Sequence, residues 1–326
     1  MKNNKNKISI VFIGTSDFGI PSLNALIKGE LFDIIGVITQ PDKKAGRGQI
    51  LAPPPIKIAA IKNNIPIWQP AKISNFPACH RLCLRQMAGR FQISKIDLIV
   101  LVAYAQIIPK KMLNIPKYGI INIHPSLLPK YRGAACVQAA IKNGDKETGV
   151  TIMKLNDGLD TGPILFQNKI KIDNSDTAGI LFDKLAKISS EILIPTLKGY
   201  INGYIKPRVQ DNTKASYVGI LKRNDGLINW HQPADVVERF IRAMTPWPSA
   251  FSKINNKILK ISEVEHQPLK INKYKTGELF LDNNQLAVQC GEDALAIKKL
   301  QLSGKKEMLA EEFIRGHKNF IGKILG

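Results

Sequence analysis

Uninterrupted apolar runs alternate with amphipathic segments in the first half of this chain. The runs occupy residues 8–13, 34–39, 98–102, 119–123 and 150–153, with a shorter one at 65–68. A strand that is apolar at every position is typical of a parallel sheet with helices on both faces. Segments 20–28, 56–62 and 134–142 have the length and pattern of short helices. The alternation predicts an α/β fold built on a parallel-rich, Rossmann-like sheet.

The pattern changes after residue 177. Apolar residues recur at close to the helical period from Thr177 to Gly199, which predicts a long helix that Pro195 kinks or shortens. Residues 205–221 lack periodicity, and we interpret them as a connecting segment. A short helix at 236–244 and closely spaced short strands from 251 to 302 then predict a small antiparallel barrel of OB type. We expect a first domain at 1–202, a linker at 203–221 and a second domain at 222–326.

Two segments rich in glycine or proline interrupt the first domain. Gly14 and Gly19 lie five residues apart after the first strand, without the spacing or the Lys-Ser/Thr pair of the common phosphate-binding turns. We assign this turn a structural role only. Residues 40–55 contain several glycines and prolines, and we interpret them as a long loop. Loops of this length within a domain are usually functional or disordered.

The composition is that of a folded protein of about two domains. The chain has 326 residues, of which 44% are hydrophobic, and no apolar run approaches the roughly 20 residues that span a bilayer. The basic N-terminus lacks the apolar core of a signal peptide, so we expect a cytoplasmic protein without membrane attachment. Four cysteines are too few for a disulfide scaffold.

The charge is strongly basic and unevenly distributed. Lys and Arg number 47 against 26 Asp and Glu, a net charge of +21. Residues 43–96 contain ten basic residues and no acidic one. A general enrichment of the sequence in lysine explains part of the net charge. It does not easily explain why residues 43–96 contain no acidic residue. A polyanionic partner, above all nucleic acid, is therefore a second explanation.

Three polar residues form the strongest candidate for a reactive site. Asn122 and His124 are two residues apart on a predicted strand, so their side chains share one face at its carboxyl end. Asp160 lies in a glycine-rich turn that follows the next strand. An amide and an imidazole suit stabilisation of an oxyanion, and a carboxylate can orient the imidazole. Taken one at a time, a structural histidine and a turn-capping aspartate explain these residues as well.

Several segments, in the same order, make the chain resemble the methionyl-tRNA formyltransferase family. Asn122-Ile123-His124 with Ser126-Leu127-Leu128-Pro129 and the distant Asp160 is common to folate-dependent formyltransferases. The loop Pro41-Asp42-Lys43-Lys44-Ala45-Gly46-Arg47-Gly48 and the segment Arg242 to Pro248 narrow the resemblance to the tRNA enzymes. The similarity covers most of residues 8–165 and parts of the second domain.

The resemblance implies formyl transfer from 10-formyltetrahydrofolate, as co-substrate, to the methionine amino group of initiator methionyl-tRNA in translation initiation. It implies a catalytic first domain and a tRNA-binding second domain, no metal, and no obligate protein partner; we expect a monomer. The expected residues, all from this sequence, are catalytic Asn122, His124 and Asp160; folate-binding Tyr104, Ala105, Ser126, Leu127, Leu128 and Pro129; and tRNA-binding Lys43, Lys44, Arg47, Lys222 and Arg223.

Two other functions remain open. Formylation of a small amine, such as a sugar nucleotide or glycinamide ribotide, fits Pro125, because His-Pro-Ser-Leu-Leu-Pro is closer to the purine-pathway enzymes. A small substrate would not need the basic stretch or the barrel. A non-catalytic RNA-binding module would not need Asn122, His124 and Asp160.

One segment departs from the family pattern. Residues 76–92 are out of keeping with the Lys-, Asn- and Ile-rich remainder of the chain, and they contain Cys79, His80 and Cys83. Three potential ligands without a fourth make a metal site there improbable.

Overall fold

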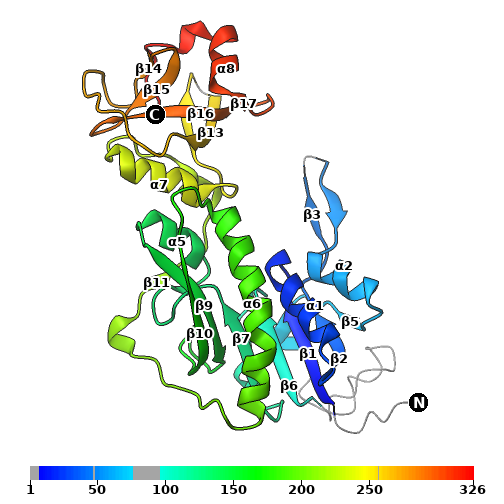
Figure 1. Cartoon of the computed structure of the whole chain (residues 1–326). Helices are drawn as coiled ribbons and strands as arrows, with labels where there is room; N and C mark the ends of the chain where they lie inside the picture. The colour runs from blue at the N-terminus through cyan, green and yellow to red at the C-terminus, as the bar shows by residue number, and fades with distance from the viewer. Residues whose placement is uncertain (1–6, 47, 76–95, 256) are drawn as a thin grey trace. The chain divides into compact units, whose positions relative to one another are not determined.

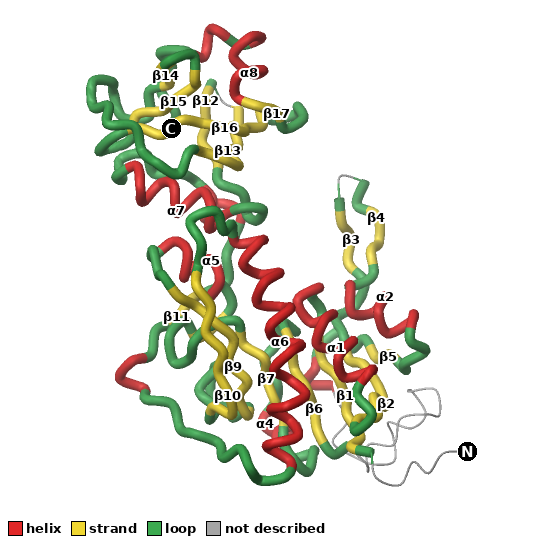
Figure 2. The backbone as a smooth tube through the Cα atoms, in the orientation of Figure 1, coloured by secondary structure: helices red, strands yellow, loops and turns green. Residues whose placement is uncertain are grey.

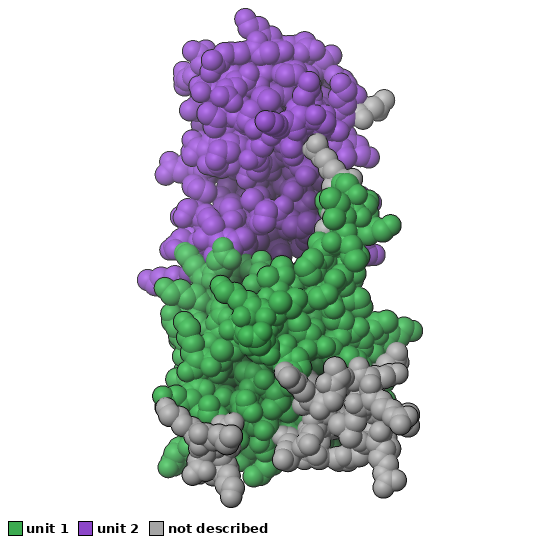
Figure 3. Space-filling view, turned by 90° about the vertical axis from the view of Figure 1, so that its right-hand side faces the viewer, with its two compact units in different colours: residues 1–134, 149–170, 182–217 green, residues 135–148, 171–181, 218–326 purple. Residues whose placement is uncertain are grey.

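The computed structural model describes residues 7–46, 48–75, 96–255 and 257–326. The chain divides into two compact units, coloured separately in Figure 3. Unit 1 comprises residues 1–134, 149–170 and 182–217, and unit 2 comprises residues 135–148, 171–181 and 218–326. The domain boundaries expected from the sequence stay a prediction.

A seven-stranded sheet forms the centre of unit 1 (Figure 1). Its strand order is β10-β9-β7-β6-β1-β2-β5. The strands β5, β2, β1, β6 and β7 are parallel, and β9 runs antiparallel to β7. Their bounds are Ile8–Gly14 (β1), Phe32–Ile38 (β2), Ile67–Trp68 (β5), Leu98–Val102 (β6), Ile120–His124 (β7), Glu147–Lys154 (β9) and Ile164–Lys171 (β10). The predicted parallel-rich α/β sheet is confirmed.

Burial explains why the inner strands were predictable and why the edge strand β10 was not. All five residues of β6 and of β7 are buried, as expected for strands covered on both faces. Helices α1 (Ile20–Lys28), α2 (Pro55–Lys62) and the short α4 (Lys110–Leu113) complete this part of the fold. In β10, exposed and half-buried positions interrupt the apolar ones, so its sequence carries no uninterrupted run.

The long helix α6 spans Ala178–Ile201 and lies in front of the central strands in Figure 1. The expectation that Pro195 shortens it is wrong, because the helix continues for six residues beyond the proline. Leu193 and Leu197 on either side are fully buried. Their packing offsets the backbone hydrogen bond that proline cannot make. No helix in the described ranges is long and apolar enough to cross a membrane.

The segment expected to be a long loop at 40–55 contains a β-hairpin. Strands β3 (Lys43–Ala45) and β4 (Ile50–Ala52) pair antiparallel and extend beyond α2 (Figure 2). Only three residues pair on each side, and Ile50 and Leu51 are exposed. So short and exposed a hairpin carries no alternating hydrophobic pattern from which it could be predicted.

The segment interpreted as a linker is ordered within unit 1 up to residue 217. Arg208 and Ile164 exchange two backbone hydrogen bonds of 2.7 and 2.8 Å, which attach the segment to the start of β10. The Arg132 amide then donates to the Ser216 carbonyl at 2.8 Å. Polar contacts between distant segments hold this region, so it has no hydrophobic period.

Unit 2 contains a curved antiparallel sheet, which confirms the predicted small β-domain. Strands β12 (Phe251–Ile254), β13 (Lys257–Val264), β14 (Leu279–Asp282), β15 (Gln285–Gln289) and β16 (Ala294–Leu302) follow the order β12-β13-β16-β15-β14. Strand β17 (Met308–Leu309) pairs with β16, and helix α8 (Ala310–Gly316) packs against β15 and β16. Helices α5 (Cys136–Lys142) and α7 (Ala234–Met244) pack against each other.

Candidate active site

The end of β7 carries the first two candidate catalytic residues. Asn122 stands beside Leu101 of β6 on one side and Met153 of β9 on the other, and His124 stands beside Thr151. Asn122 is 8% exposed and His124 is 5% exposed. The two side chains therefore lie in a place where little water dilutes their electrostatic interactions.

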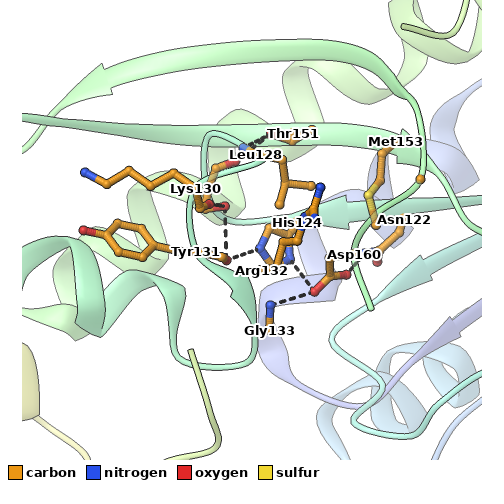
Figure 4. Close-up of polar contacts among 12 residues, drawn as sticks. Asn122, His124, Leu128, Lys130, Tyr131, Arg132, Gly133, Thr151, Met153 and Asp160 are labelled. Carbon is orange, nitrogen blue, oxygen red and sulfur yellow. Dashed lines mark hydrogen bonds and ion pairs between the residues drawn. The ribbon is translucent and has the colours of Figure 1, made fainter. Parts of the chain in front are cut away.

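Asp160 meets both of these residues from the loop between β9 and β10 (Figure 4). The Asn122 amide Nδ2 donates to Asp160 Oδ1 at 3.4 Å, and His124 Nδ1 lies 3.7 Å from Asp160 Oδ2. The Gly133 backbone amide donates to Asp160 Oδ2 at 2.8 Å. The structure thus brings Asp160, which the sequence placed in a separate turn, beside the two residues of β7.

Hydrogen-bond chemistry determines where a proton sits on His124. Its Nε2 lies 2.9 Å from the carbonyl oxygen of Tyr131. A carbonyl oxygen only accepts, so Nε2 carries a proton and donates it. Nδ1 faces the Asp160 carboxylate at a distance longer than a good hydrogen bond. The Asn122 amide contact is also long, at 3.4 Å, so this donor can turn to a third oxygen at little energetic cost. Nδ1 becomes a second donor when the imidazole is protonated.

The turn after His124 is held by polar contacts. Ser126 Oγ donates to the Lys130 carbonyl at 2.7 Å, and Thr151 Oγ1 donates to the Ser126 carbonyl at 2.6 Å. The Leu128 amide donates to Thr151 Oγ1 at 3.1 Å. Leu128 is buried, whereas Leu127 and Pro129 are half-buried. The turn therefore presents part of an apolar wall directly beside His124.

Tyr104 and Ala105 follow β6 at the same edge of the sheet. The Tyr104 ring packs in a hydrophobic cluster with Ile99, Ile108 and Met112, while Ala105 is exposed. The Tyr104 carbonyl accepts from the Gln40 side chain at 2.7 Å. Burial raises the pKa of Tyr104 to about 12, so its hydroxyl stays protonated at neutral pH. Ala105 and the backbone, rather than the Tyr104 ring, are the parts that can face a ligand.

Tyr104→Phe is expected to leave the KM for a folate donor unchanged. The hydroxyl has no hydrogen-bond partner among the described residues, so its removal relieves a buried unsatisfied group. The free energy of unfolding should rise by about 1 kcal/mol. Denaturant titration and donor saturation curves measure the two quantities. A KM raised tenfold or more would assign the hydroxyl to the ligand.

The base of the β3–β4 hairpin is fixed to helix α2 and to the residue that follows β5. Lys57 Nζ contacts Asp42 Oδ2 at 2.7 Å, and the Gln69 amide donates to Asp42 Oδ1 at 2.8 Å. Hydrogen bonds from Gln69 and Lys57 hold the pKa of Asp42 below its usual range. Lys43 and Lys44 are exposed on β3, and Arg47 lies outside the described residues. The hairpin thus presents cationic side chains on an anchored base.

The remaining candidates lie elsewhere. Lys222 and Arg223 are exposed in unit 2, where residues Arg223–Gly226 form a 3-10 turn. Cys79, His80 and Cys83 fall in the undescribed range 76–95. In the ranges that the structure describes, no group of three or more His, Cys, Asp or Glu side chains could hold a metal ion.

Sequence reasoning missed the groups that hold the three candidate residues in place. These are the Tyr131 carbonyl, the Gly133 amide and the side chains of Thr151 and Gln210. Tyr131, Gly133 and Asp160 all have positive φ angles, of 59°, 105° and 51°. Gly133 in the sequence Tyr131-Arg132-Gly133 was an available signal, since glycine tolerates such a conformation.

Two family models cover most of the chain. A formyl transferase model matches residues 6–197, and a formyl transferase C-terminal domain model matches residues 220–318. The methionyl-tRNA formyltransferase of Dehalococcoides mccartyi strain CBDB1 is 41% identical over 98% of this chain and 99% of its own length. That of Citrifermentans bemidjiense is 39% identical over 97% and 96%, and that of Clostridium novyi is 38% identical over 98% and 100%.

Solved structures share the fold at lower identity. A sugar 3N-formyl transferase, solved with dTDP and 5-N-formyl-THF, has a TM-score of 0.64 at 24% identity and covers 92% of this chain and 99% of its own. An N-formyltransferase from Helicobacter canadensis, in complex with folinic acid and dTDP-3-aminofucose, has a TM-score of 0.65 at 20% identity, covering 89% and 99%. The methionyl-tRNA formyltransferase from Clostridium thermocellum has a TM-score of 0.53 at 17% identity, covering 89% and 98%.

Proposed function

Since the chain belongs to the methionyl-tRNA formyltransferase family, we propose that it transfers a formyl group from 10-formyltetrahydrofolate to the methionine amine of initiator methionyl-tRNA. The product is N-formylmethionyl-tRNA for translation initiation. The observation that carries the proposal is the convergence of Asn122, His124 and Asp160 at the end of β7, where the Asp160 carboxylate lies 3.4 Å from the Asn122 amide and 3.7 Å from the His124 imidazole. Identity of about 40% along nearly the whole length to methionyl-tRNA formyltransferases supports the choice of substrate.

The proposed reaction begins with attack of the neutral α-amine on the formyl carbon. A C–N bond forms, and the carbonyl electron pair moves onto oxygen as an oxyanion. The Asn122 amide and the His124 Nδ1–H of the imidazolium donate to that oxygen. Both groups are buried and adjoin the same Asp160 carboxylate, so they lie close together before the negative charge develops.

Asp160 completes the proton balance. Its carboxylate stabilises the imidazolium and takes the proton that the attacking nitrogen gives up, directly or through water. The oxyanion electron pair then re-forms the formyl C=O bond, the bond between the formyl carbon and N10 of the folate breaks, and N10 takes up the proton from Asp160. The 2.8 Å bond from Gly133 to Oδ2 keeps the carboxylate beside the reacting atoms. No covalent intermediate with the protein is needed.

The folate is proposed to lie against the turn Ser126-Leu127-Leu128-Pro129, with Ala105 and the Tyr104 backbone on the opposite side. Ser126 shapes this turn from within, because its side chain is fully buried and hydrogen-bonded to the Lys130 carbonyl. Leu127 and Pro129 are the more accessible members and offer apolar contact to a pterin ring. His124, which precedes the turn by two residues, then lies beside the formyl group.

The tRNA is proposed to contact the hairpin residues Lys43, Lys44 and Arg47 in unit 1 and Lys222 and Arg223 in unit 2. Residues 203–326 carry 20 basic and 13 acidic side chains, which suits phosphate contacts along a polyanion.

One protein of similar fold, the sugar 3N-formyl transferase, is named for a sugar substrate. Formylation of a small amine is therefore the second candidate function.

A panel of acceptors tests the proposal. The purified protein receives 10-formyltetrahydrofolate and, in separate reactions, methionyl-tRNA, an amino-sugar nucleotide or glycinamide ribotide. We expect formylation of charged initiator tRNA, with a rate that falls steeply as salt rises from about 50 to 200 mM. Faster formylation of either small amine, or a rate that salt does not affect, would contradict the proposed substrate.

Arg47→Ala is expected to raise the KM for charged tRNA about tenfold and to leave the KM for the folate donor unchanged. Lys62→Ala is the matched control, because it removes one exposed charge from α2 in the same unit without altering the hairpin. Steady-state kinetics with both substrates measure the effect. Equal tRNA kinetics in the two variants would remove the hairpin from tRNA recognition.

A further inference from the structure

One buried side chain from the ordered segment before residue 217 connects to the loop that carries Asp160. The Gln210 Nε2 donates to the carbonyl oxygens of Asp160 at 2.8 Å and Gly162 at 2.7 Å. Gln210 is 5% exposed, so little water competes for these bonds. Its single amide group therefore fixes the backbone on both sides of Thr161.

The oxygen of the same Gln210 amide binds the buried guanidinium of Arg132. Gln210 Oε1 accepts from Arg132 Nε at 3.1 Å and from Nη2 at 2.8 Å. Arg132 is 1% exposed, and its Nη2 and Nη1 also donate to the neutral side chains of Asn212 and Tyr217. Since a guanidinium only donates, it orients the Gln210 amide so that Oε1 faces Arg132 and Nε2 faces the Asp160 loop.

The Asp160 loop needs such a restraint. Asp160 has a φ of 51°, a left-handed conformation that aspartate adopts more readily than most residues but that still costs energy relative to glycine. Its carboxylate touches His124 and Asn122 only through long contacts. The carboxyl group is therefore positioned by its backbone and by Gly133, and Gln210 holds that backbone from the opposite side.

We infer that Gln210 is a positioning residue for formyl transfer, acting through the backbone of Asp160. Arg132 sets the orientation of the Gln210 amide, and Gln210 sets the position of the Asp160 carboxylate relative to His124. The inference rests on the proposed function, because it assigns Asp160 a part in the reaction. Gln210 lies in the segment 205–221, which we interpreted from its sequence as a connecting segment.

The substitution Gln210→Glu distinguishes a positioning role of Gln210 from a general contribution to folding. The carboxylate keeps an acceptor for Arg132 and adds an ion pair, but it places an acceptor opposite the Asp160 and Gly162 carbonyls. Displacement of a reacting group by about 1 Å can cost about 10²-fold in rate. We expect kcat to fall roughly 10- to 100-fold, with the KM for tRNA and for folate within about twofold of the parent.

Gln289→Glu in unit 2 is the matched control. Gln289 is 2% exposed and donates to three backbone carbonyls, those of Ile271, Cys290 and Asp293. The same amide-to-acid change there should lower the melting temperature and leave kcat of the folded protein unchanged. If Q210E does not fold, Gln210→Asn replaces it, because the shorter side chain stays neutral but cannot reach both partners.

The crystal structure of the variant supplies a readout that does not depend on activity. We expect Asp160 to leave its contacts with Gly133 and His124. A variant with parental kcat, or one in which Asp160 keeps both contacts, overturns the positioning role. Failure of the proposed function can be distinguished from failure of the positioning role. In the first case the parent protein does not formylate methionyl-tRNA, while the structure of the variant still shows whether Asp160 has moved.

Discussion

His124→Ala is expected to lower kcat for formylation of methionyl-tRNA by roughly 10² to 10³ with the protein still folded. The imidazole is 5% exposed and faces Asp160 at 3.7 Å, so its removal deletes a preorganised donor to the developing oxyanion. KM should change little, because the lost interaction forms only in the transition state. Single-turnover rates at saturating substrates measure the loss.

His317→Ala is the matched control for this prediction. His317 also contacts a backbone carbonyl, that of Phe313 at 3.0 Å, but it lies at the end of α8 in unit 2. Its removal should leave kcat unchanged. A His124→Ala protein that is folded and turns over at the parental rate would remove His124 from the mechanism.

Gly162→Ala is expected to lower the free energy of unfolding by roughly 3 kcal/mol and kcat by at least about tenfold. A Cβ at this position would overlap with the backbone carbonyl oxygen of Lys154, at the end of β9. Backbone atoms of a central sheet cannot move aside, so the Asp160 loop must shift instead. Denaturant titration and kcat of the folded protein measure the two effects.

Gly219→Ala provides the comparison. A Cβ there meets nothing within 4 Å, so the free energy of unfolding should change by less than about 0.5 kcal/mol. If the two alanine variants are equally stable and equally active, the close approach of Gly162 to β9 does not hold the Asp160 loop.

Strands buried on both faces were predictable, whereas the edge strand β10 was not. The run Leu98–Val102 coincides with β6, because complete burial leaves only apolar residues acceptable at every position. In β10, Gln167, Asn168 and the lysines reach solvent or polar partners, so the strand depends on pairing that no local pattern records. Tertiary contacts also decide that α6 continues through Pro195.

The candidate site was predictable in its reacting groups and not in its supports. Asn122 and His124 share a strand, and their two-residue spacing specifies a common face. Asp160 was a candidate because it is a carboxylate in a glycine-rich turn after the next strand, and the structure shows it beside both. Gln210 could not be found in this way, because its partners are backbone carbonyls 48 and 50 residues away, and carbonyls have no sequence signature.

The most direct test of the central claim is to identify the amino acid released from tRNA after reaction. The protein is incubated with 10-formyltetrahydrofolate and initiator methionyl-tRNA, the ester is hydrolysed, and the amino acid is analysed by mass spectrometry. The account predicts N-formylmethionine from the parent protein and at least about 10²-fold less from a protein with alanine at Asn122 and His124. Unmodified methionine from the parent, or equal formylation by the double variant, would contradict it.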